Sequence, residues 1–248
     1  MRIRYFDTLP STNRYCKLLS QNETEEFDVI VAREQTNGIG QRGNHWESDG
    51  GCNLTFSIIL KPVFLAMSDQ YMMTKAVALG VHDWVSSILH DEARSVKIKW
   101  PNDIYVGDKK ICGILIENDI QNQHLMRSIV GIGININQTQ FSTAAGRATS
   151  LKLESGHDVD LESALTTVVT TIEGRYRQLA SGATDKIDSD YLLHLYQRGE
   201  SASYCYQGAV LTAVIEGVNR YGHLILHSAN GRKITCQLKE IQFLSEPR

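Results

Sequence analysis

The sequence predicts an α+β fold in which a mixed β-sheet with flanking helices precedes a small β-barrel. Strand patterns and helical patterns with three- and four-residue spacing follow one another up to about residue 199. Beyond that point only short β runs remain, separated by Gly, Asn and Arg. The 248 residues, 42% of them hydrophobic, can bury a core without disulfides or metals. We therefore expect one domain at 1–199 and a second at 200–248.

The first domain is expected to contain both strands and helices. After a strand at 3–7, Ser11 or Thr12 can cap a helix that carries Tyr15, Leu18 and Leu19 on one face. The other predicted elements are strands at 28–34 and 53–61, a long helix at 68–90, β segments at 96–106, 111–119 and 126–137, and helices at 161–179 and 187–198. The second domain is expected to hold strands at 201–206, 209–218, 224–227, 233–238 and 241–244.

Charge and cysteine usage exclude several classes of protein. A net charge of −3 gives no global electrostatic reason to bind nucleic acid or an anionic membrane. The 5 cysteines are odd in number and widely spaced, which supports neither a disulfide framework nor a zinc knuckle. His223 and His227 lie on a strand and turn, where they would not form a helical metal pair. Apolar runs of signal or membrane-spanning length are absent, so we expect a cytoplasmic protein.

A glycine-rich segment at 35–52, here called the glycine loop, contains the pattern G-x-G-x-x-G at 38–43. The dinucleotide-binding fingerprint requires a helix that opens at the third glycine and an acidic residue about twenty positions later, and neither follows. The P-loop pattern is absent too. What remains is a loop whose backbone amides can surround an anion, with Arg42 supplying positive charge. Gln35 adds a hydrogen-bonding amide and Trp46 a flat aromatic surface, which together suit a nucleotide and a polar ring. The alternative is a surface loop with glycines for turns alone.

Two lysines occupy positions that call for an explanation. Lys99 lies inside a strand, where a charge is costly unless it meets an anion, and Lys110 begins a very apolar strand. The alternatives are that Lys99 faces solvent and that Lys110 belongs to a charged hairpin tip at 107–110. Gly131 and Gly133 lie within a strand, which indicates a bulge, close approach of a ligand or backbone, or packing against a helix.

The order of these pieces resembles one family, the biotin–protein ligases. The motifs are STN at 11–13, QTNGIGQRGNHW at 35–46, KWPND at 99–103, KICGILIE at 110–117 and GIGIN at 131–135. The resemblance implies a catalytic domain related to class II aminoacyl-tRNA synthetases, followed by an SH3-like β-barrel. It also implies an ATP-dependent enzyme that forms biotinyl-5′-AMP with Mg²⁺ and passes biotin to a lysine of a biotin carboxyl carrier protein.

The resemblance assigns roles to matching positions. Lys110, Lys99 and Arg42 are expected to be catalytic, and Asp103 is a candidate for helping to hold Mg²⁺. Residues expected on the biotin side are Ser11, Thr12, Asn13, Gln35, Gly38, Ile39, Gly40, Gln41, Lys110 and Gly113. Residues expected on the ATP side are Gln41, Arg42, Asn44, Trp46, Lys99, Asn102, Asp103 and Asn135.

This chain also departs from the family pattern. Many family members carry two arginines where this loop has Ile39 and Gln41, so we expect Arg42 to supply the missing phosphate contact. Ten residues precede Ser11, and family members that repress transcription carry a winged-helix domain ahead of that point, so we expect ligase activity without nucleic-acid binding. The rivals are a lipoate or octanoyl protein ligase, whose triple glycine does not occur here, and a non-catalytic biotin sensor. A homodimer is left open.

Overall fold

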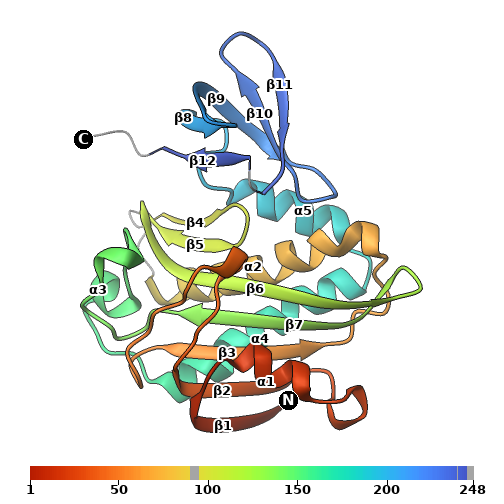
Figure 1. Cartoon of the computed structure of the whole chain (residues 1–248), viewed down its shortest axis with the longest axis vertical. Helices are drawn as coiled ribbons and strands as arrows, with labels where there is room; N and C mark the ends of the chain where they lie inside the picture. Colours follow the sequence, from red (N-terminus) through yellow and green to blue (C-terminus); the bar gives the residue numbers. More distant parts are fainter. Residues whose placement is uncertain (90–94, 239, 245–248) are drawn as a thin grey trace.

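The computed structural model describes residues 1–89, 95–238 and 240–244. The first unit is built on a seven-stranded sheet in the order β1-β2-β3-β7-β6-β5-β4 (Figure 1). Its strands are β1 Arg2–Leu9, β2 Asp28–Gln35, β3 Leu54–Leu60, β4 Val96–Lys99, β5 Asp103–Val106, β6 Lys109–Gln121 and β7 His124–Ile134. Only β1 and β2 pair in parallel and the other described neighbours pair antiparallel, so the expected mixed sheet is confirmed.

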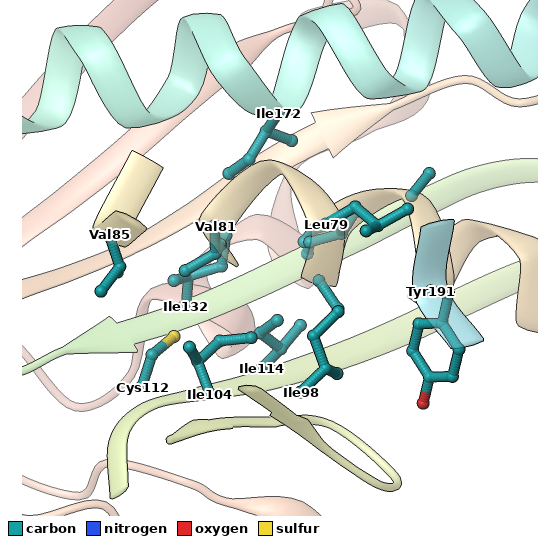
Figure 2. Packing of buried hydrophobic residues seen from close by; sticks show 14 of the residues in the cluster. Leu79, Val81, Val85, Ile98, Ile104, Cys112, Ile114, Ile132, Ile172 and Tyr191 are labelled. Carbon is teal, nitrogen blue, oxygen red and sulfur yellow. The ribbon is translucent and has the colours of Figure 1, made fainter. Parts of the chain in front are cut away.

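Helices cover the two faces of this sheet unequally. They are α1 Thr12–Leu18, α2 Gln70–Leu89, α3 Leu151–Ser155, α4 Leu161–Ala180 and α5 Thr184–Leu193. Strand β2 shows the division, because Val29 and Val31 enter the large core under α2 and α4 whereas Ile30 and Ala32 enter a small cluster under α1. Figure 2 shows the large core, where Leu79 and Val81 of α2 lie over the sheet. The face that carries α1 is therefore less covered and has room for a site.

A second, five-stranded antiparallel sheet follows α5 (Figure 1). Its strands are β8 Ser201–Tyr206, β9 Ala209–Val218, β10 Leu224–Ser228, β11 Lys233–Cys236 and β12 Ile241–Phe243. The first four form a meander and β12 returns to pair with β8, which confirms the expected small β unit. Whether 1–199 and 200–248 are separate domains stays a prediction. No described helix is long and apolar enough to cross a membrane.

The segment between α5 and the second sheet extends the first one. The amide of Ile98 donates to the carbonyl of His194 at 2.8 Å, and the amide of Tyr196 donates back to Ile98 at 2.9 Å. Residues 194–196 thus pair with β4, and for this reason α5 ends at Leu193 rather than at the expected residue 198.

The predicted β segment 96–106 breaks at Pro101, where the sequence favours a turn, and the structure confirms this break as the turn of a β4–β5 hairpin. One expectation about α1 was wrong. Leu18 was expected on the apolar face of α1 but is 84% exposed, and the buried positions are Thr12, Asn13 and Cys16. Helix α1 therefore turns polar groups toward the sheet, which its apolar spacing alone did not show. The predicted helix 68–90 is α2, although residue 90 lies outside the described residues.

The contact between α2 and α4 predicts opposite effects for two glycine substitutions. A Cβ at Gly80 would lie 2.5 Å from the backbone Cα of Ile172, so Gly80→Ala should destabilise the fold by about 1–3 kcal/mol despite better helix propensity. Gly174 is exposed on α4 and a Cβ there meets no described atom within 4 Å, so Gly174→Ala should stabilise by up to about 1 kcal/mol. Urea unfolding measures both. Equal effects would contradict this packing.

A pair of close histidine rings predicts loss of stability in mild acid. The rings of His82 and His194 lie 3.9 Å apart, and burial, helped by the charges of His82 and Lys97, lowers the pKa of His194 to about 4. The unfolded chain takes up this proton near the ordinary pKa of 6.5, the folded chain only near 4. Stability from this group is thus complete above pH 6.5 and falls toward pH 4.

The variant His194→Asn should show a shallower decline of unfolding free energy between these pH values than the wild type. Substitution of the exposed His157 by Asn serves as the control and should leave the decline unchanged. Unfolding by urea at a series of pH values measures the slope, and identical slopes for wild type and His194→Asn would contradict the assignment.

Candidate active site

A cavity of about 270 Å³ lies on the face of the first sheet that carries α1. Its walls come from α1, the glycine loop, the β4–β5 turn, β6, β7 and the end of the second sheet. Predicted site residues in the lining are Ser11, Thr12, Asn13, Gln35, Ile39, Gly40, Gln41, Asn44, Trp46, Asn102, Asp103, Lys110 and Gly113. Sequence motifs far apart in the chain thus meet around one space.

One end of the cavity is polar and fixed by hydrogen bonds. Ser11 is the N-cap of α1, and its hydroxyl accepts from the amide of Arg14 at 3.5 Å. The amide and hydroxyl of Thr12 both donate to the Gln35 side-chain oxygen, at 2.8 and 3.2 Å. Because that oxygen is engaged, Gln35 offers its NH₂ group to the cavity. This end therefore presents donors suited to a carbonyl oxygen.

A buried network that the sequence did not reveal supports this end. Ser57 of β3 is fully buried, and its hydroxyl lies 2.7 Å from Thr12 Oγ1 and 2.6 Å from Asn13 Oδ1. The Asn13 amide nitrogen donates to Glu117 at 2.9 Å, and Lys17 pairs with the same carboxylate at 2.6 Å. These contacts fix which way the Asn13 amide faces. An isolated serine within an apolar strand was the only sequence signal for it.

Glycines form the floor of the cavity. Gly113 of β6 pairs directly with Gly133 of β7, so two bare backbones lie side by side. A Cβ at Gly133 would lie 2.3 Å from the Trp46 indole, and one at Gly131 would lie 2.3 Å from Asn13 Oδ1. The register is regular here, so a bulge is excluded among the three alternatives; close approach of Trp46 explains Gly133, and packing against α1 explains Gly131.

The glycine loop folds back on itself and carries Trp46 onto this floor. The Trp46 amide donates to the Gly38 carbonyl at 3.1 Å, and Gly40 donates to Asn44 at 2.6 Å. A short 3₁₀ turn at Gln41–Gly43 takes the place of the helix that a dinucleotide fold would need. Within the described part of the chain, the Trp46 indole Nε1 is buried without a hydrogen-bond partner.

Lys110 and Asp103 form the charged part of the cavity. The Lys110 ammonium lies 2.7 Å from the Asp103 carboxylate and 5.7 Å from the Trp46 ring centroid. Its side chain is 30% exposed, so it can reach a ligand. The paired carboxylate keeps this partly buried cation from standing alone, and an anionic ligand can compete for it.

Lys99 does not join Lys110 in the lining. Its ammonium lies 3.2 Å from the hydroxyl of Tyr105 and 4.5 Å from that ring's centroid, and it lies 5.0 Å from the ring of Phe243 in the second sheet. Burial lowers the pKa of Lys99, and the Asp103 charge offsets part of that shift. The structure thus places the Lys99 ammonium among aromatic rings, and its contact with an anionic ligand stays a prediction.

Two other predicted residues also stand apart from the lining. Asn135 is buried and its amide nitrogen donates to the carbonyl of Thr149 at 2.9 Å, so it anchors the chain after β7 and does not face the cavity. Gly38 is not among the lining residues, and its carbonyl accepts the hydrogen bond from the Trp46 amide. The side chain of Arg42 lies outside the described residues.

The second sheet contributes a wall that sequence reasoning missed. Leu238, Ile241 and Phe243 line the cavity, although this region contains no recognisable motif. Apolar residues near the end of a small β unit carry no signal of their own. Among the residues that the structure describes, no group of three or more His, Cys, Asp or Glu side chains could hold a metal.

Comparisons with known proteins define the class. A sequence profile described as the biotin/lipoate A/B protein ligase family matches residues 5–135, more than half of the chain. The chain is 30% identical over 238 residues to the bifunctional ligase/repressor BirA of Bacillus spizizenii, covering 92% of this chain and 70% of that protein. This chain belongs to the biotin/lipoate A/B protein ligase family.

Within that family the similarity is to the biotin–protein ligases. The biotin–[acetyl-CoA-carboxylase] ligase of Paracoccus denitrificans is 29% identical over 209 residues, covering 83% of this chain and 86% of that protein. The biotin protein ligase from Aquifex aeolicus, solved in complex with biotin and ATP, has a TM-score of 0.80, 24% identity and 97% coverage of both chains. That structure supports the fold.

The seat of Trp46 predicts a spectroscopic effect. Gly133→Ala puts a methyl group where the indole lies and should push Trp46 outward, so collisional quenching of tryptophan emission by acrylamide should increase. The other two tryptophans, Trp84 and Trp100, are 2% and 3% exposed, so the change reports Trp46. Gly174→Ala is the control. Unchanged quenching in Gly133→Ala would show that the indole is seated elsewhere.

Proposed function

We propose that this chain is an ATP-dependent biotin–protein ligase that forms biotinyl-5′-AMP and transfers biotin to a lysine of a biotin carboxyl carrier protein. The observation that carries the proposal is the position of Lys110, which lines one cavity together with the donor end at Ser11 and Gln35 and the turn that carries Asp103. Binding biotin next to ATP requires hydrogen-bond donors for the biotin ring, a cation for its carboxylate, and polar groups for the nucleotide, and this cavity contains all three. The names of the relatives point the same way.

The donor end fits the ureido ring of biotin. Gln35 offers its NH₂ group and Ser11 its hydroxyl proton, which match a urea oxygen as acceptor. Asn13, held by Ser57 and Glu117, closes this end over Gly131. Gly113 lines the same cavity beside Trp46 and Lys110, and we place the aliphatic tail along this stretch, ending at Lys110.

Lys110 addresses the difficulty of the first step, which brings a carboxylate to a polyphosphate. Two like charges 4 Å apart repel by about 4 kcal/mol at an effective dielectric near 20, so a cation must already be in place. A biotin carboxylate oxygen attacks the α-phosphorus, the bond from phosphorus to the bridging oxygen breaks, and pyrophosphate leaves with that electron pair. Lys110, freed from Asp103 by exchange of carboxylates, holds the attacking group and the α-phosphate.

The nucleotide side is assigned to the glycine loop and the β4–β5 turn. Asn102 and Asp103 face the cavity with Asn44 and Gln41, and Trp46 offers its flat ring and its unpartnered Nε1 in the described structure. The roles proposed for Lys99, Asn135 and Arg42 toward ATP stay predictions. Asp103 fits Mg²⁺ as a single carboxylate, since Mg²⁺ is usually held by one or two carboxylates and by phosphates. Bound there, Mg²⁺ would offset phosphate charge.

In the second step the ε-amine of the carrier lysine attacks the acyl carbon of the anhydride. The bond from that carbon to the phosphate oxygen breaks, AMP leaves, and the amine loses a proton. The glycine loop, with Trp46 over the floor, keeps water from the anhydride until the carrier arrives.

The direct test is the mass of the carrier. Incubation of the protein with ATP, Mg²⁺, biotin and an apo biotin carrier domain should add one biotinyl group, detected by mass spectrometry. Lipoate in place of biotin should leave the carrier unchanged, and addition of lipoyl would support the lipoate ligase rival. A protein that binds biotin but releases no pyrophosphate from ATP would be the non-catalytic biotin sensor.

Neutralising Lys110 should abolish most of the turnover. Lys110→Met keeps the aliphatic stem and removes the charge, so adenylate formation should fall about 100- to 1000-fold, the usual effect of removing one group that stabilises developing charge. The adjacent Lys109 is 59% exposed and lies 3.7 Å from Glu154, which makes Lys109→Met a matched control expected to retain activity. Normal pyrophosphate release by Lys110→Met would overturn the proposed role.

A further inference from the structure

The turn between β4 and β5 forms one wall of the cavity, and its position is set from two sides. Trp100, Pro101, Asn102 and Asp103 all line the cavity. The two strands that flank the turn, Val96–Lys99 and Asp103–Val106, are short; the first is last in the sheet order and the second pairs with β6. From the β6 side, the backbone and the side chain of Asn102 are both bonded to Ile114, and from behind a second set of contacts reaches Pro101.

Tyr71, in the first turn of α2, makes the central contact. Its hydroxyl donates to the carbonyl of Pro101 at 3.0 Å and lies 3.2 Å from the hydroxyl of Tyr191 on α5. Since Tyr71 has one proton and gives it to Pro101, Tyr191 must be the donor to the Tyr71 oxygen. Burial raises the pKa of Tyr71 well above its ordinary value, so the hydroxyl remains a donor at any working pH.

A buried cation fixes both rings. Lys75, one turn further along α2, is 1% exposed, and its ammonium lies 5.7 Å from the Tyr71 ring centroid and 5.5 Å from that of Tyr191. It is ion-paired with Asp188 of α5, which offsets the cost of burying its charge. We call Tyr71, Lys75, Asp188 and Tyr191 the Tyr71 cluster. The cluster joins α2 to α5 and ends at the Pro101 carbonyl.

A turn of the second sheet packs closely against the same cluster. The β9–β10 turn contains Gly222 at φ +84°, and a Cβ there would lie 2.3 Å from the Tyr71 ring. The indole of Trp100 donates to the Gly222 carbonyl at 2.9 Å. Arg220, in the same turn, pairs with Asp69 at 2.8 Å just before α2. The turn of the second sheet is thus held against both Tyr71 and the cavity wall.

We propose that Tyr71 is a positioning residue for the nucleotide half of the active site, and that the Gly222 turn of the second sheet acts through it. The inference rests on the proposed function, because it assigns Asn102 and Asp103 to ATP. Tyr71 holds the Pro101 carbonyl and, together with the bonds between Asn102 and Ile114, sets where the two following side chains face the cavity. The donor end at Ser11 and Gln35 belongs to other elements and does not depend on this contact.

The test is a split between two Michaelis constants. In Tyr71→Phe the ring stays and the hydroxyl is lost, so KM for ATP should rise about 2- to 10-fold, the size of one hydrogen bond, while KM for biotin stays within about twofold. Biotin-dependent exchange of pyrophosphate into ATP measures both constants. The matched control is Tyr176→Phe, which removes another buried tyrosine hydroxyl, bonded to Glu26 away from the cavity. It should lower the melting temperature and leave both constants unchanged.

A second pair of variants tests the second sheet. Gly222→Ala forces a methyl group against Tyr71 and should raise KM for ATP in the same direction. Gly208→Ala meets the same backbone strain, at φ +84°, but a Cβ there touches no described atom within 4 Å, so it should leave KM for ATP unchanged.

The outcomes separate the two proposals. A wild-type protein without biotin-dependent exchange would refute the proposed function itself. An active wild type with KM for ATP equal in Tyr71→Phe, Tyr176→Phe and wild type would overturn the positioning role. Equal KM for ATP in Gly222→Ala and Gly208→Ala would overturn the part assigned to the second sheet.

Discussion

One cross-strand row of the sheet determines where the cavity lies and what lines it. Along this row Lys99 pairs with Asp103, Asp103 with Gly113, Gly113 with Gly133, and Gly133 with Thr55. The two central members lack side chains, so the backbone itself is the floor and the indole of Trp46 can rest on it. A shift of one residue in the pairing of β6 would turn large side chains into this space, since neighbours in a strand face opposite ways. The register is therefore the condition on which the site depends.

Charge follows from the same row. Asp103 stands opposite Gly113, and Lys110 is the second residue of the strand that carries Gly113, so carboxylate and ammonium meet above the bare floor at 2.7 Å. In the proposed reaction this pair has to open, because both the biotin carboxylate and the phosphate compete for the ammonium. A cation already neutralised by a protein carboxylate avoids the cost of an isolated buried charge and still exchanges partners. The polar end at Thr12 and Gln35 has no such partner to give up, since its donors are fixed by neutral groups.

The sequence predicted most elements and the lining residues that lie in motifs, because periodicity, capping and turn composition are local. What it missed depends on partners far away in the chain. Lys99 lies beside Phe243, and the direction of a side chain on a short edge strand is decided by such a neighbour. The side chain of Asn135 donates a hydrogen bond to the carbonyl of Thr149, and the hydroxyl of Ser57 donates to the side chain of Asn13. The spacing of residues in the sequence does not indicate either contact. The polar inner face of α1 was not predicted for the same reason. Leu18 of this helix points toward solvent, whereas the side-chain amide of Asn13 is buried against the sheet.

The pairing of residues 194–196 with β4 has a consequence for the behaviour of the protein at high concentration. A sheet that ended at β4 would expose a row of unpaired amides and carbonyls, a template for another chain to add a strand. Here the carbonyl of His194 and the amide of Tyr196 occupy the groups of Ile98. Residues 194–196 of the same chain thus cover the edge of the sheet just before the small β unit begins. Because these groups are already bonded within the chain, a strand of another molecule is less able to add to the sheet at this edge.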